Sequence, residues 1–537
     1  MPPICQGNIY SHNYQLALIY LSRLSSKERR LAMDLQDVEH TVREQGKLQQ
    51  ELWKTAQTPW TSSILPRADS LIQARASLPK SLANEGMGFD HTRKHILDDI
   101  VPGFNASSIS PNYYGFVTGG ITPAAQFADS IVSTYDQNVQ VHLTEHTIAT
   151  DVEFNALGLL ADLLRLDKQT WQHGTFTTGA TASNILGLAC GREYVLRAAA
   201  SRKGATSTSV GEHGLFEVLL AAGLSGVQVL STLPHSCIAK AAGILGIGRA
   251  NVKNICREDN PLLIDLARLE AELAQSDKAS IVAVSCGEVN TGNFATTSLQ
   301  DMQAIRRLCD KYGAWLHVDG AFGIFGRILA DSEEFAAVKQ GSAGMELADS
   351  IAGDGHKMLN VPYDCGFFLC RHADEAGRVF QNANAAYLTG GAAASIPSPL
   401  NIGIENSRRF RALPVYASLV AYGRVGYQVM LQKQIRLARM IAAWLFEHPG
   451  YNTLLEMDTK EALVDKTFVV VLFSAKNDAL NQDLATRIND TSKIFVSGTS
   501  WEGRPACRIA ISNWRVEEER DFEVVVDVLD NVARQDN

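Results

Sequence analysis

Residues 279–319 read ASIVAVSCGEVNTGNFATTSLQDMQAIRRLCDKYGAWLHVD, and this stretch decides the fold. The apolar run at 279–285 predicts a buried strand, and the later run AWLHV predicts a second strand that ends just before Asp319. Between them, apolar residues recur at helical spacing, with Ser298 as a suitable N-cap and Gly313 as a suitable end. A strand, helix, strand unit of this kind is a right-handed crossover in an open α/β sheet, whose ligands bind beyond the carboxyl ends of the strands. We therefore expect Asp319 at a ligand-binding edge.

The same alternation of short apolar runs and amphipathic helices extends over residues 106–400 and predicts a large α/β domain with a mostly parallel sheet. Residues 1–105 are polar with a helical pattern, which predicts an N-terminal arm or dimerisation segment. Residues 401–537 combine a long helical stretch with two short apolar runs and predict a small α+β domain. A chain of 537 residues is long enough for this division.

The composition is that of a globular protein, with 46% apolar and 20% charged residues. The formal charge of -9 provides no basic surface for nucleic acid, and the chain has no apolar run of about 18 residues that would predict a membrane span. The first residues do not have the pattern of a cleaved signal. Nine cysteines without metal-ligand spacing indicate reduced thiols, so we expect a cytoplasmic protein with no metal site.

Two segments have the residue types of a phosphorylated cofactor site. The sequence FTTGATASN at 176–184 is a turn rich in glycine and hydroxyl groups that leads into a helix, and the amide groups of a helix start bind phosphate. The alternative is an ordinary turn with Thr181 as the N-cap. His235 follows a short strand at 227–230, where an imidazole can lie against an aromatic cofactor ring, or it is an ordinary loop histidine.

Two charged residues follow apolar runs. Asp319 requires a cationic or hydrogen-bonding partner, because a buried unpaired carboxylate is costly; the alternative is an aspartate that caps a turn. Lys357 follows a strand-like segment that begins at Ala348. A lysine in such a place can be desolvated, and its neutral amine can then attack an aldehyde. The alternative is a solvated lysine, which is the more common case. The turn, the histidine, the aspartate and the lysine occur in one α/β domain, and together they favour a cofactor with an aldehyde and a phosphate.

These motifs resemble those of the group II pyridoxal-phosphate-dependent amino-acid decarboxylases, the family of aromatic-L-amino-acid and glutamate decarboxylases. The resemblance extends from about residue 111 to residue 426. Its carriers are Asn112–Phe116, Thr178–Thr181 with Asn184 and Arg192, His235–Ala241, His317–Ala321, Asp349 with His356 and Lys357, and Ser407–Arg409. The resemblance implies an α/β, fold type I (PLP-dependent transferase-like) architecture with a mostly parallel seven-stranded sheet, a helical N-terminal segment and a small α+β C-terminal domain.

The resemblance also implies roles for residues around the cofactor ring, which is that of pyridoxal 5′-phosphate. Lys357 is similar to the lysine that forms the Schiff base, and Asp319 to the partner of the pyridine nitrogen. His235 resembles the histidine that stacks on the ring, and Ala321 the contact on the opposite ring face.

The remaining implied roles concern the phosphate and a proton. Ala180 and Thr181 are similar to phosphate ligands, and His356 to a neighbour of the phosphate or of the lysine. Tyr387 lies where the family has an active-site tyrosine on a mobile loop, which implies that it protonates Cα of the product.

The implied reaction is the decarboxylation of an L-amino acid to the amine and CO₂, with an aromatic substrate slightly preferred. An aromatic wall from Tyr113, Tyr114, Phe116 and Thr118 is one interpretation of that region, and a core-facing cluster is the other. The alternatives to the reaction are an aldehyde synthase, a transaminase or another lyase, an acidic substrate such as glutamate, and a catalytically silent cofactor-binding protein. Family members are typically dimers, so we expect a homodimer.

Several positions depart from the common family pattern. Gly320 replaces a more common alanine, and residues 137–145 carry polar groups where aromatic-specific members are more apolar, which weakens an aromatic assignment. Glu288 stands where many members have threonine beside the cofactor, and Asp354 stands where aromatic decarboxylases often have asparagine near the phosphate. No arginine can be assigned from the sequence as a clamp for a side-chain carboxylate of the substrate, so a glutamate-like substrate is not supported.

Overall fold

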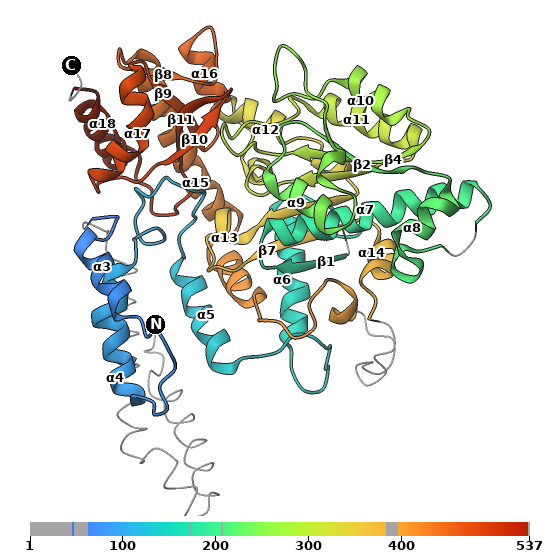
Figure 1. The fold of residues 1–537 in the computed structure, drawn as a ribbon, viewed down its shortest axis with the longest axis horizontal. Coiled ribbons are helices and arrows are strands. Elements are labelled where there is room, and N and C mark those ends of the chain that lie inside the picture. Colours follow the sequence, from blue (N-terminus) through green and yellow to red (C-terminus); the bar gives the residue numbers. More distant parts are fainter. Residues whose placement is uncertain (1–45, 48–62, 172, 206–207, 383–395, 535–537) are drawn as a thin grey trace, which may run out of the picture. The chain divides into compact units, whose positions relative to one another are not determined.

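The computed structural model describes residues 46–47, 63–171, 173–205, 208–382 and 396–534 (Figure 1). The described residues fall into two compact units. The first contains residues 46–47 and 66–104, and the second contains the described residues among 63–65 and 105–534. In the first unit, α3 (Ala68–Ser77) and α4 (Gly88–His95) confirm a helical N-terminal segment, and neither helix contains a buried residue.

The second unit is built on a seven-stranded sheet with the strand order β1-β7-β6-β5-β4-β2-β3. Only β7 runs antiparallel to its neighbours, so the prediction of a mostly parallel sheet is confirmed. The strands are β1 (His173–Thr177), β2 (Gly226–Ser231), β3 (Val252–Asn254), β4 (Lys278–Ser285), β5 (Trp315–Asp319), β6 (Ser350–Asp354) and β7 (Gly366–Cys370).

Helices cover both faces of this sheet, and the alternation of side chains along each strand shows which core each residue joins. In β4, Ile281 belongs to the core beneath α7 (Ala180–Arg202), whereas Val282 belongs to the core on the opposite face. That opposite core includes residues of α5 (Pro123–Tyr135), α6 (Ala149–Leu163) and α11 (Leu299–Tyr312). The remaining helices of eight residues or more around the sheet are α8 (Val210–Ala222), α9 (Ser236–Ile244), α10 (Leu266–Leu273) and α14 (Ala373–Phe380).

The unit predicted at residues 279–319 forms as expected. The side chain of Ser298 caps α11 by accepting a hydrogen bond from Asp301 N, and Gly313 ends the helix with a left-handed φ of 68°. The strand bounds differ from the prediction by one residue. β4 begins at Lys278, and β5 runs from Trp315 to Asp319, so that Asp319 is the last residue of this strand instead of the residue after it.

A four-stranded antiparallel sheet with the order β10-β11-β9-β8 lies near the C-terminus and confirms the predicted small α+β part. Its strands are β8 (Tyr451–Thr453), β9 (Val470–Ala475), β10 (Ser497–Trp501) and β11 (Arg504–Ala510), and its helices are α16 (Lys460–Lys466), α17 (Asp478–Asp490) and α18 (Glu518–Arg534). The long helix α15 (Ala412–Glu447) joins the two sheets, since Ile435 packs in the core of the large sheet and Leu437 in that of the small one.

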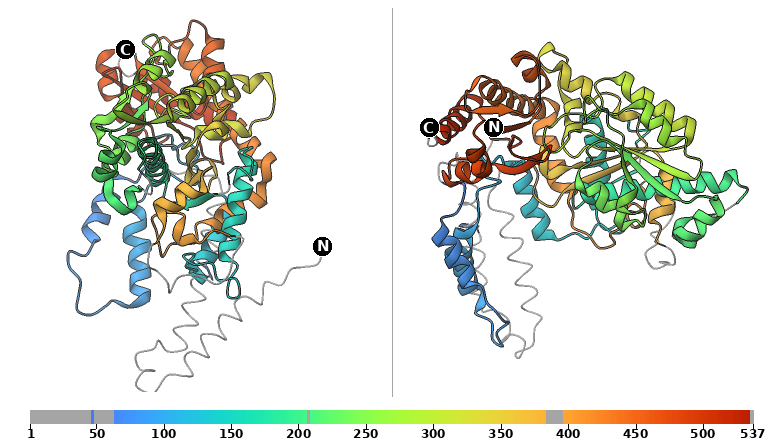
Figure 2. Two further views of the ribbon diagram at one scale, coloured as in Figure 1. Left: turned by 90° about the vertical axis from the view of Figure 1, so that its right-hand side faces the viewer. Right: turned by 45° about the horizontal axis from the view of Figure 1, so that its top comes forward.

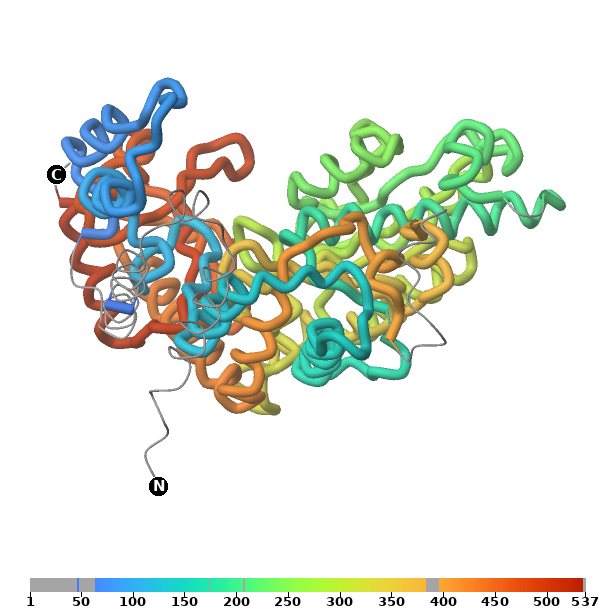
Figure 3. The backbone as a smooth tube through the Cα atoms, turned by 90° about the horizontal axis from the view of Figure 1, so that it is seen from below, coloured from blue at the N-terminus to red at the C-terminus, as the bar shows by residue number. Residues whose placement is uncertain are grey.

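Within this unit, Figures 2 and 3 show the two sheets as neighbouring lobes, the small one in red and the large one mainly in green and yellow. Across the part of the chain that the structure describes, no helix combines the length and the apolar character needed to cross a bilayer.

Candidate active site

Asp319 lies at the carboxyl edge of the large sheet, between two neighbouring strands. It pairs with Ser285 of β4 on one side and with Ala352 of β6 on the other. Its side chain is buried, and each carboxylate oxygen accepts a hydrogen bond. Oδ1 accepts from the amide of Ala321 at 3.3 Å, and Oδ2 accepts from Nδ2 of Asn184 at 3.2 Å. The structure therefore provides the hydrogen-bonding partners that a buried carboxylate requires.

His235 lies close to the predicted charges of the site. It is the N-cap of α9, and its Nδ1 accepts a hydrogen bond from the amide of Cys237 at 3.2 Å. Burial lowers the pKa of His235, while the charge of Asp319 raises it and that of Lys357 lowers it. Burial raises the pKa of Asp319, and the charges of His235 and Lys357 oppose this rise. The three groups predicted from the sequence thus interact in one place.

Lys357 stands in the short helix α13 (Gly355–Met358), directly after β6. Its Nζ lies 2.9 Å from Oδ2 of Asp354, a side chain that is only 5% exposed. The same Nζ lies 5.6 Å from the ring centroid of Phe322. The amine is therefore held between a buried carboxylate and an aromatic ring, instead of extending into solvent.

Asn360 fixes the backbone that follows the lysine. Its Nδ2 donates to the carbonyl oxygen of Gly119 at 2.6 Å and to that of Ser512 at 3.1 Å. A Cβ atom added at Gly119 would lie 1.8 Å from the carbonyl oxygen of Lys357, so this approach requires glycine. Three segments that are distant in the sequence thus meet behind the lysine.

The glycine-rich turn lies at the start of α7, as expected, but its details differ from the prediction. Gly179 is the N-cap and Thr181 lies inside the first turn, so the interpretation of Thr181 as N-cap is wrong. The amide of Ala180, a predicted phosphate ligand, donates to Oδ1 of Asp354 at 2.5 Å. The other amide groups of a first helical turn, including that of Thr181, have no acceptor within the helix.

His356 and Ala321 are next to this cluster. Nε2 of His356 lies 3.4 Å from Oδ1 of Asp354, and the imidazole stacks on Tyr363 with 4.3 Å between ring centroids. Burial lowers the pKa of His356, and the charge of Asp354 opposes this shift. Ala321 is half-buried and approaches the site carboxylate through its amide. Tyr387 lies outside the described residues, so its predicted role stays a prediction.

Arg508 belongs to the site and was missed in the sequence. It lies in β11, is 7% exposed, and its charge lowers the pKa of His235. Its NH1 donates to the carbonyl oxygen of Val289 at 2.6 Å and its NH2 to that of Gly115 at 3.1 Å. Its buried Nε has no hydrogen-bond partner among the described residues. An arginine within the apolar run of a strand was the only signal in the sequence.

Burial lowers the pKa of Arg508, and the charge of Glu288 opposes this shift. The carboxylate of Glu288 accepts from the amides of Asn290 at 3.0 Å and Thr291 at 2.8 Å, and from Oγ1 of Thr291 at 2.9 Å. These hydrogen bonds stabilise the loop after β4, and the carboxylate of Glu288 therefore binds groups of its own loop.

The geometry places a lysine, an aspartate and a histidine at one sheet edge, and the comparison with known families agrees. The profile of the pyridoxal-dependent decarboxylase conserved domain matches residues 73–467. The chain belongs to this family.

Two relatives in the comparison are about a quarter identical to this chain over the residues that align. L-2,4-Diaminobutyrate decarboxylase of Acinetobacter baumannii is 27% identical over 328 residues, which cover 59% of this chain and 60% of that protein. Tryptophan decarboxylase 1 of Oryza sativa subsp. japonica is 25% identical over 450 residues, or 80% of this chain and 82% of that protein. This chain therefore spans less than two thirds of the diaminobutyrate enzyme.

Solved structures show the same fold. The crystal structure of Oryza sativa TDC with PLP and tryptamine superposes with a TM-score of 0.74 at 22% identity, over 94% of this chain and 99% of that one. This likeness confirms the fold type I architecture.

The residues of this member of the family fit the family cofactor, pyridoxal 5′-phosphate. A ring with a basic nitrogen, an aldehyde and a phosphate requires an anion, an amine and a cluster of amide donors. The chain provides Asp319, Lys357 and the start of α7 in one buried cluster. The hydrogen bond between Asp354 and Ala180 is the one contact that competes for a phosphate donor.

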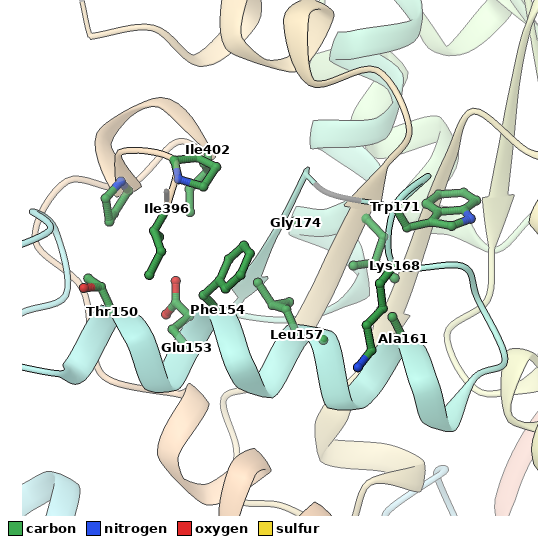
Figure 4. A pocket seen from close by; sticks show the side chains of 14 residues that line it. Thr150, Glu153, Phe154, Leu157, Ala161, Lys168, Trp171, Gly174, Ile396 and Ile402 are labelled. Carbon is green, nitrogen blue, oxygen red and sulfur yellow. The ribbon is translucent and has the colours of Figure 1, made fainter. Parts of the chain in front are cut away.

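A separate apolar cavity of about 160 Å³ lies between α6 and the edge strand β1 (Figure 4). Phe154 and Leu157 of α6 line it, together with Trp171 and the polar side chains of Glu153 and Lys168. None of the predicted site residues lines this cavity.

Proposed function

We propose that the protein releases the carboxylate of an L-amino acid as CO₂, with aromatic amino acids as the preferred substrates. The observation that carries the proposal is the placement of Asp319 at the end of β5, of Lys357 directly after the neighbouring strand β6, and of His235 at the start of α9, at the carboxyl edge of the sheet. When bound, pyridoxal phosphate supplies an electron sink for the electron pair that remains on Cα after CO₂ departs.

The residues of the cluster would hold this cofactor from every side. Lys357 would bind the aldehyde carbon, and Asp319, as a carboxylate, would keep a proton on the ring nitrogen. His235 and Ala321 would contact the two ring faces. Ala180, Thr181 and His356 would surround the phosphate, which requires that Asp354 give up its hydrogen bond to Ala180 or share it.

Arg508 is proposed to bind the carboxylate of the incoming amino acid. Its guanidinium is buried, retains an unpaired Nε, and acts electrostatically on His235. An arginine in such a site binds carboxylates with strong, charge-assisted hydrogen bonds. Tyr387 is proposed to deliver the proton that replaces the carboxylate on Cα.

The preference for aromatic side chains rests on fewer residues than expected. Tyr114 is fully buried and Tyr113 stacks on Phe495 with 4.8 Å between centroids, so these two tyrosines belong to the core. Phe116 remains 58% exposed one residue after Gly115, whose carbonyl binds Arg508. An exposed aromatic ring beside a buried arginine supports a substrate with an aromatic side chain and a carboxylate.

A panel of amino acids tests the proposal. We expect purified protein with pyridoxal phosphate to release CO₂ and the amine from L-tryptophan, L-tyrosine or L-phenylalanine with a higher kcat/KM than from L-aspartate, L-glutamate or L-2,4-diaminobutyrate. The last three belong in the panel because relatives include aspartate and diaminobutyrate decarboxylases. A higher kcat/KM for one of them would contradict the aromatic preference.

The product distinguishes the reaction from its alternatives. Aldehyde with ammonia would indicate an aldehyde synthase, a keto acid would indicate a transaminase, and no turnover with cofactor bound would indicate a silent protein. For Tyr387, we expect Tyr387→Phe to lower amine formation or to yield aldehyde, and unchanged amine formation would remove this residue from the mechanism.

We further propose that the protein is a homodimer in the cytoplasm. The helices α6 and α15 pack together and expose large apolar side chains, including Phe154 (45%) and Val425 (70%). Exposed apolar surface of this kind is typical of subunit interfaces. The eight cysteines within the described residues are free thiols, which supports a reducing compartment. Sedimentation of a stable monomer would contradict the dimer.

A further inference from the structure

Strand β5 directs three polar side chains toward α7. Trp315, His317 and Asp319 alternate along the strand and therefore share one face of the sheet. Two glycines of α7 let the helix approach this face. A Cβ atom at Gly187 would lie 2.3 Å from the ring of His317, and one at Gly191 would lie 2.7 Å from that of Trp315.

A continuous chain of hydrogen bonds runs beneath the helix from Trp315 to Asp319. Nε1 of Trp315 lies 3.0 Å from Oγ of Ser350, which lies 2.8 Å from Nδ1 of His317. Nε2 of His317 lies 2.7 Å from Oδ1 of Asn184, whose Nδ2 lies 3.2 Å from Oδ2 of Asp319. The first four side chains are completely buried or nearly so, with exposed fractions of 0% for Trp315, Ser350, His317 and Asn184.

The chemistry of the two ends fixes every proton along this chain. An indole nitrogen can only donate, so Ser350 accepts from Trp315 and turns its own proton toward Nδ1 of His317. Burial lowers the pKa of His317 to about 3, so the ring is neutral and its single proton lies on Nε2. His317 therefore donates to Oδ1 of Asn184, which leaves the amide protons of Asn184 to face Asp319. In all four hydrogen bonds, the donor is the residue farther from the carboxylate of Asp319 and the acceptor is the one nearer to it.

We infer that Ser350, His317 and Asn184 are positioning residues that keep Asp319 ionised and correctly oriented for the ring nitrogen of the cofactor. The inference rests on the proposed role of Asp319. A buried carboxylate without donors takes up a proton, and a protonated carboxyl group could not hold the ring nitrogen charged. The series of hydrogen bonds provides Asp319 with a donor, the amide of Asn184, whose orientation is fixed by His317.

These hydrogen bonds also explain how Ser350, which does not contact Asp319, can control the hydrogen bonding of its carboxylate. Loss of the Ser350 hydroxyl allows His317 to move its proton to Nδ1, and Nε2 then becomes an acceptor. The amide of Asn184 would rotate to donate to Nε2, which would turn its oxygen toward Asp319. The carboxylate would lose a donor and face a lone pair.

Ser350→Ala tests this inference through the affinity of the cofactor-free, full-length protein for two ligands. One ligand is pyridoxal 5′-phosphate, and the other is 1-deazapyridoxal 5′-phosphate, which has carbon in place of the ring nitrogen. We expect the wild-type protein to prefer the natural cofactor about tenfold, as measured by fluorescence titration, because only this ligand bonds to Asp319. Ser350→Ala should reduce the preference to about threefold or less by weakening only the binding of the natural cofactor.

Ser280→Ala is the matched control. Ser280 is a buried serine in the adjacent strand β4, and its Oγ accepts a hydrogen bond from Gln228 at 3.2 Å, outside the chain. This variant should retain the wild-type preference. Asn184→Ala interrupts the chain at its other end and should lose the preference too, so it serves as a second variant if Ser350→Ala fails to fold.

Asp319→Asn separates the inference from the proposed function. If Asp319→Asn loses the preference and Ser350→Ala and Asn184→Ala keep it, the positioning chain is refuted while the role of Asp319 stands. If Asp319→Asn keeps the preference, the proposed role of Asp319 fails and the inference fails with it. Equal weakening of both ligands in Ser350→Ala would indicate a purely structural role and would also refute the inference.

Discussion

Replacing Arg408 by methionine should strongly destabilise the protein without touching the cofactor cluster. Arg408 and Glu153 form a two-pronged ion pair, with NH1 2.6 Å from Oε2 and NH2 2.5 Å from Oε1. The two side chains are only 2% and 5% exposed. Arg408→Met would leave Glu153 as a buried charge without its partner. Breaking such a pair costs about 3–5 kcal/mol of unfolding free energy.

Urea denaturation at one fixed protein concentration measures this cost. With an m value of roughly 3 kcal/mol/M, the midpoint of Arg408→Met should fall by about 1–1.7 M, with m unchanged. The double variant Glu153→Leu/Arg408→Met removes both charges and should recover to within about 1 kcal/mol of the wild type, because apolar pairs of similar volume replace buried ion pairs well.

An exposed ion pair provides the control for this experiment. Lys460 and Glu447 lie 2.5 Å apart with side chains that are 39% and 64% exposed, so Lys460→Met should cost less than about 1 kcal/mol. The reasoning fails if Arg408→Met behaves like Lys460→Met, or if the double variant is as unstable as the single one.

Three further outcomes are expected. Lys357→Ala should carry no covalently attached cofactor after borohydride treatment, as measured by mass spectrometry, and a retained adduct would mean that another amine binds the aldehyde. Arg508→Met should raise KM for the amino acid about 10- to 100-fold, with Arg508→Lys intermediate, since a charge-assisted hydrogen bond contributes about 1.5–3 kcal/mol; an unchanged KM would exclude a carboxylate role. Burial lowers the pKa of His173 from 6.5 to about 4, so the neutral ring stabilises the fold fully above pH 6.5 and this stability is lost as the pH falls toward 4. Unfolding free energy should therefore fall over this range by up to about 1.4 kcal/mol per pH unit from this group, and His173→Phe should show a flatter pH dependence in urea denaturation.

Elements with strong local signals were predictable from the sequence. The helix between Ser298 and Gly313 has a cap, a periodic apolar face and a glycine end, and it forms as expected. The positions of Asp319 and Lys357 near the carboxyl edge of the sheet were also predictable, because each follows an apolar run and the carboxyl ends of parallel strands meet at one edge.

Contacts between distant segments were not predictable in this way. The bond between Ala180 and Asp354 joins residues 174 positions apart, and that between Gly115 and Arg508 joins residues 393 positions apart. No local pattern predicts such pairs, since the first depends on the order of the strands in the large sheet and the second on how the two sheets pack. For the same reason, the aromatic residues near Tyr114 could not be divided between core and site before the fold was known.

The amide of Asn360, which bonds to Gly119 and Ser512, limits how far this protein can be shortened or recombined. The family match ends at residue 467, yet Ser512 and Arg508 lie beyond it. A chain cut at that point would retain every predicted cofactor residue but would lose both the support behind the lysine and the buried guanidinium. A chimera that takes its C-terminal sheet from a relative must therefore supply a carbonyl group and an arginine in these two places, or it will be a binding domain without a functional site.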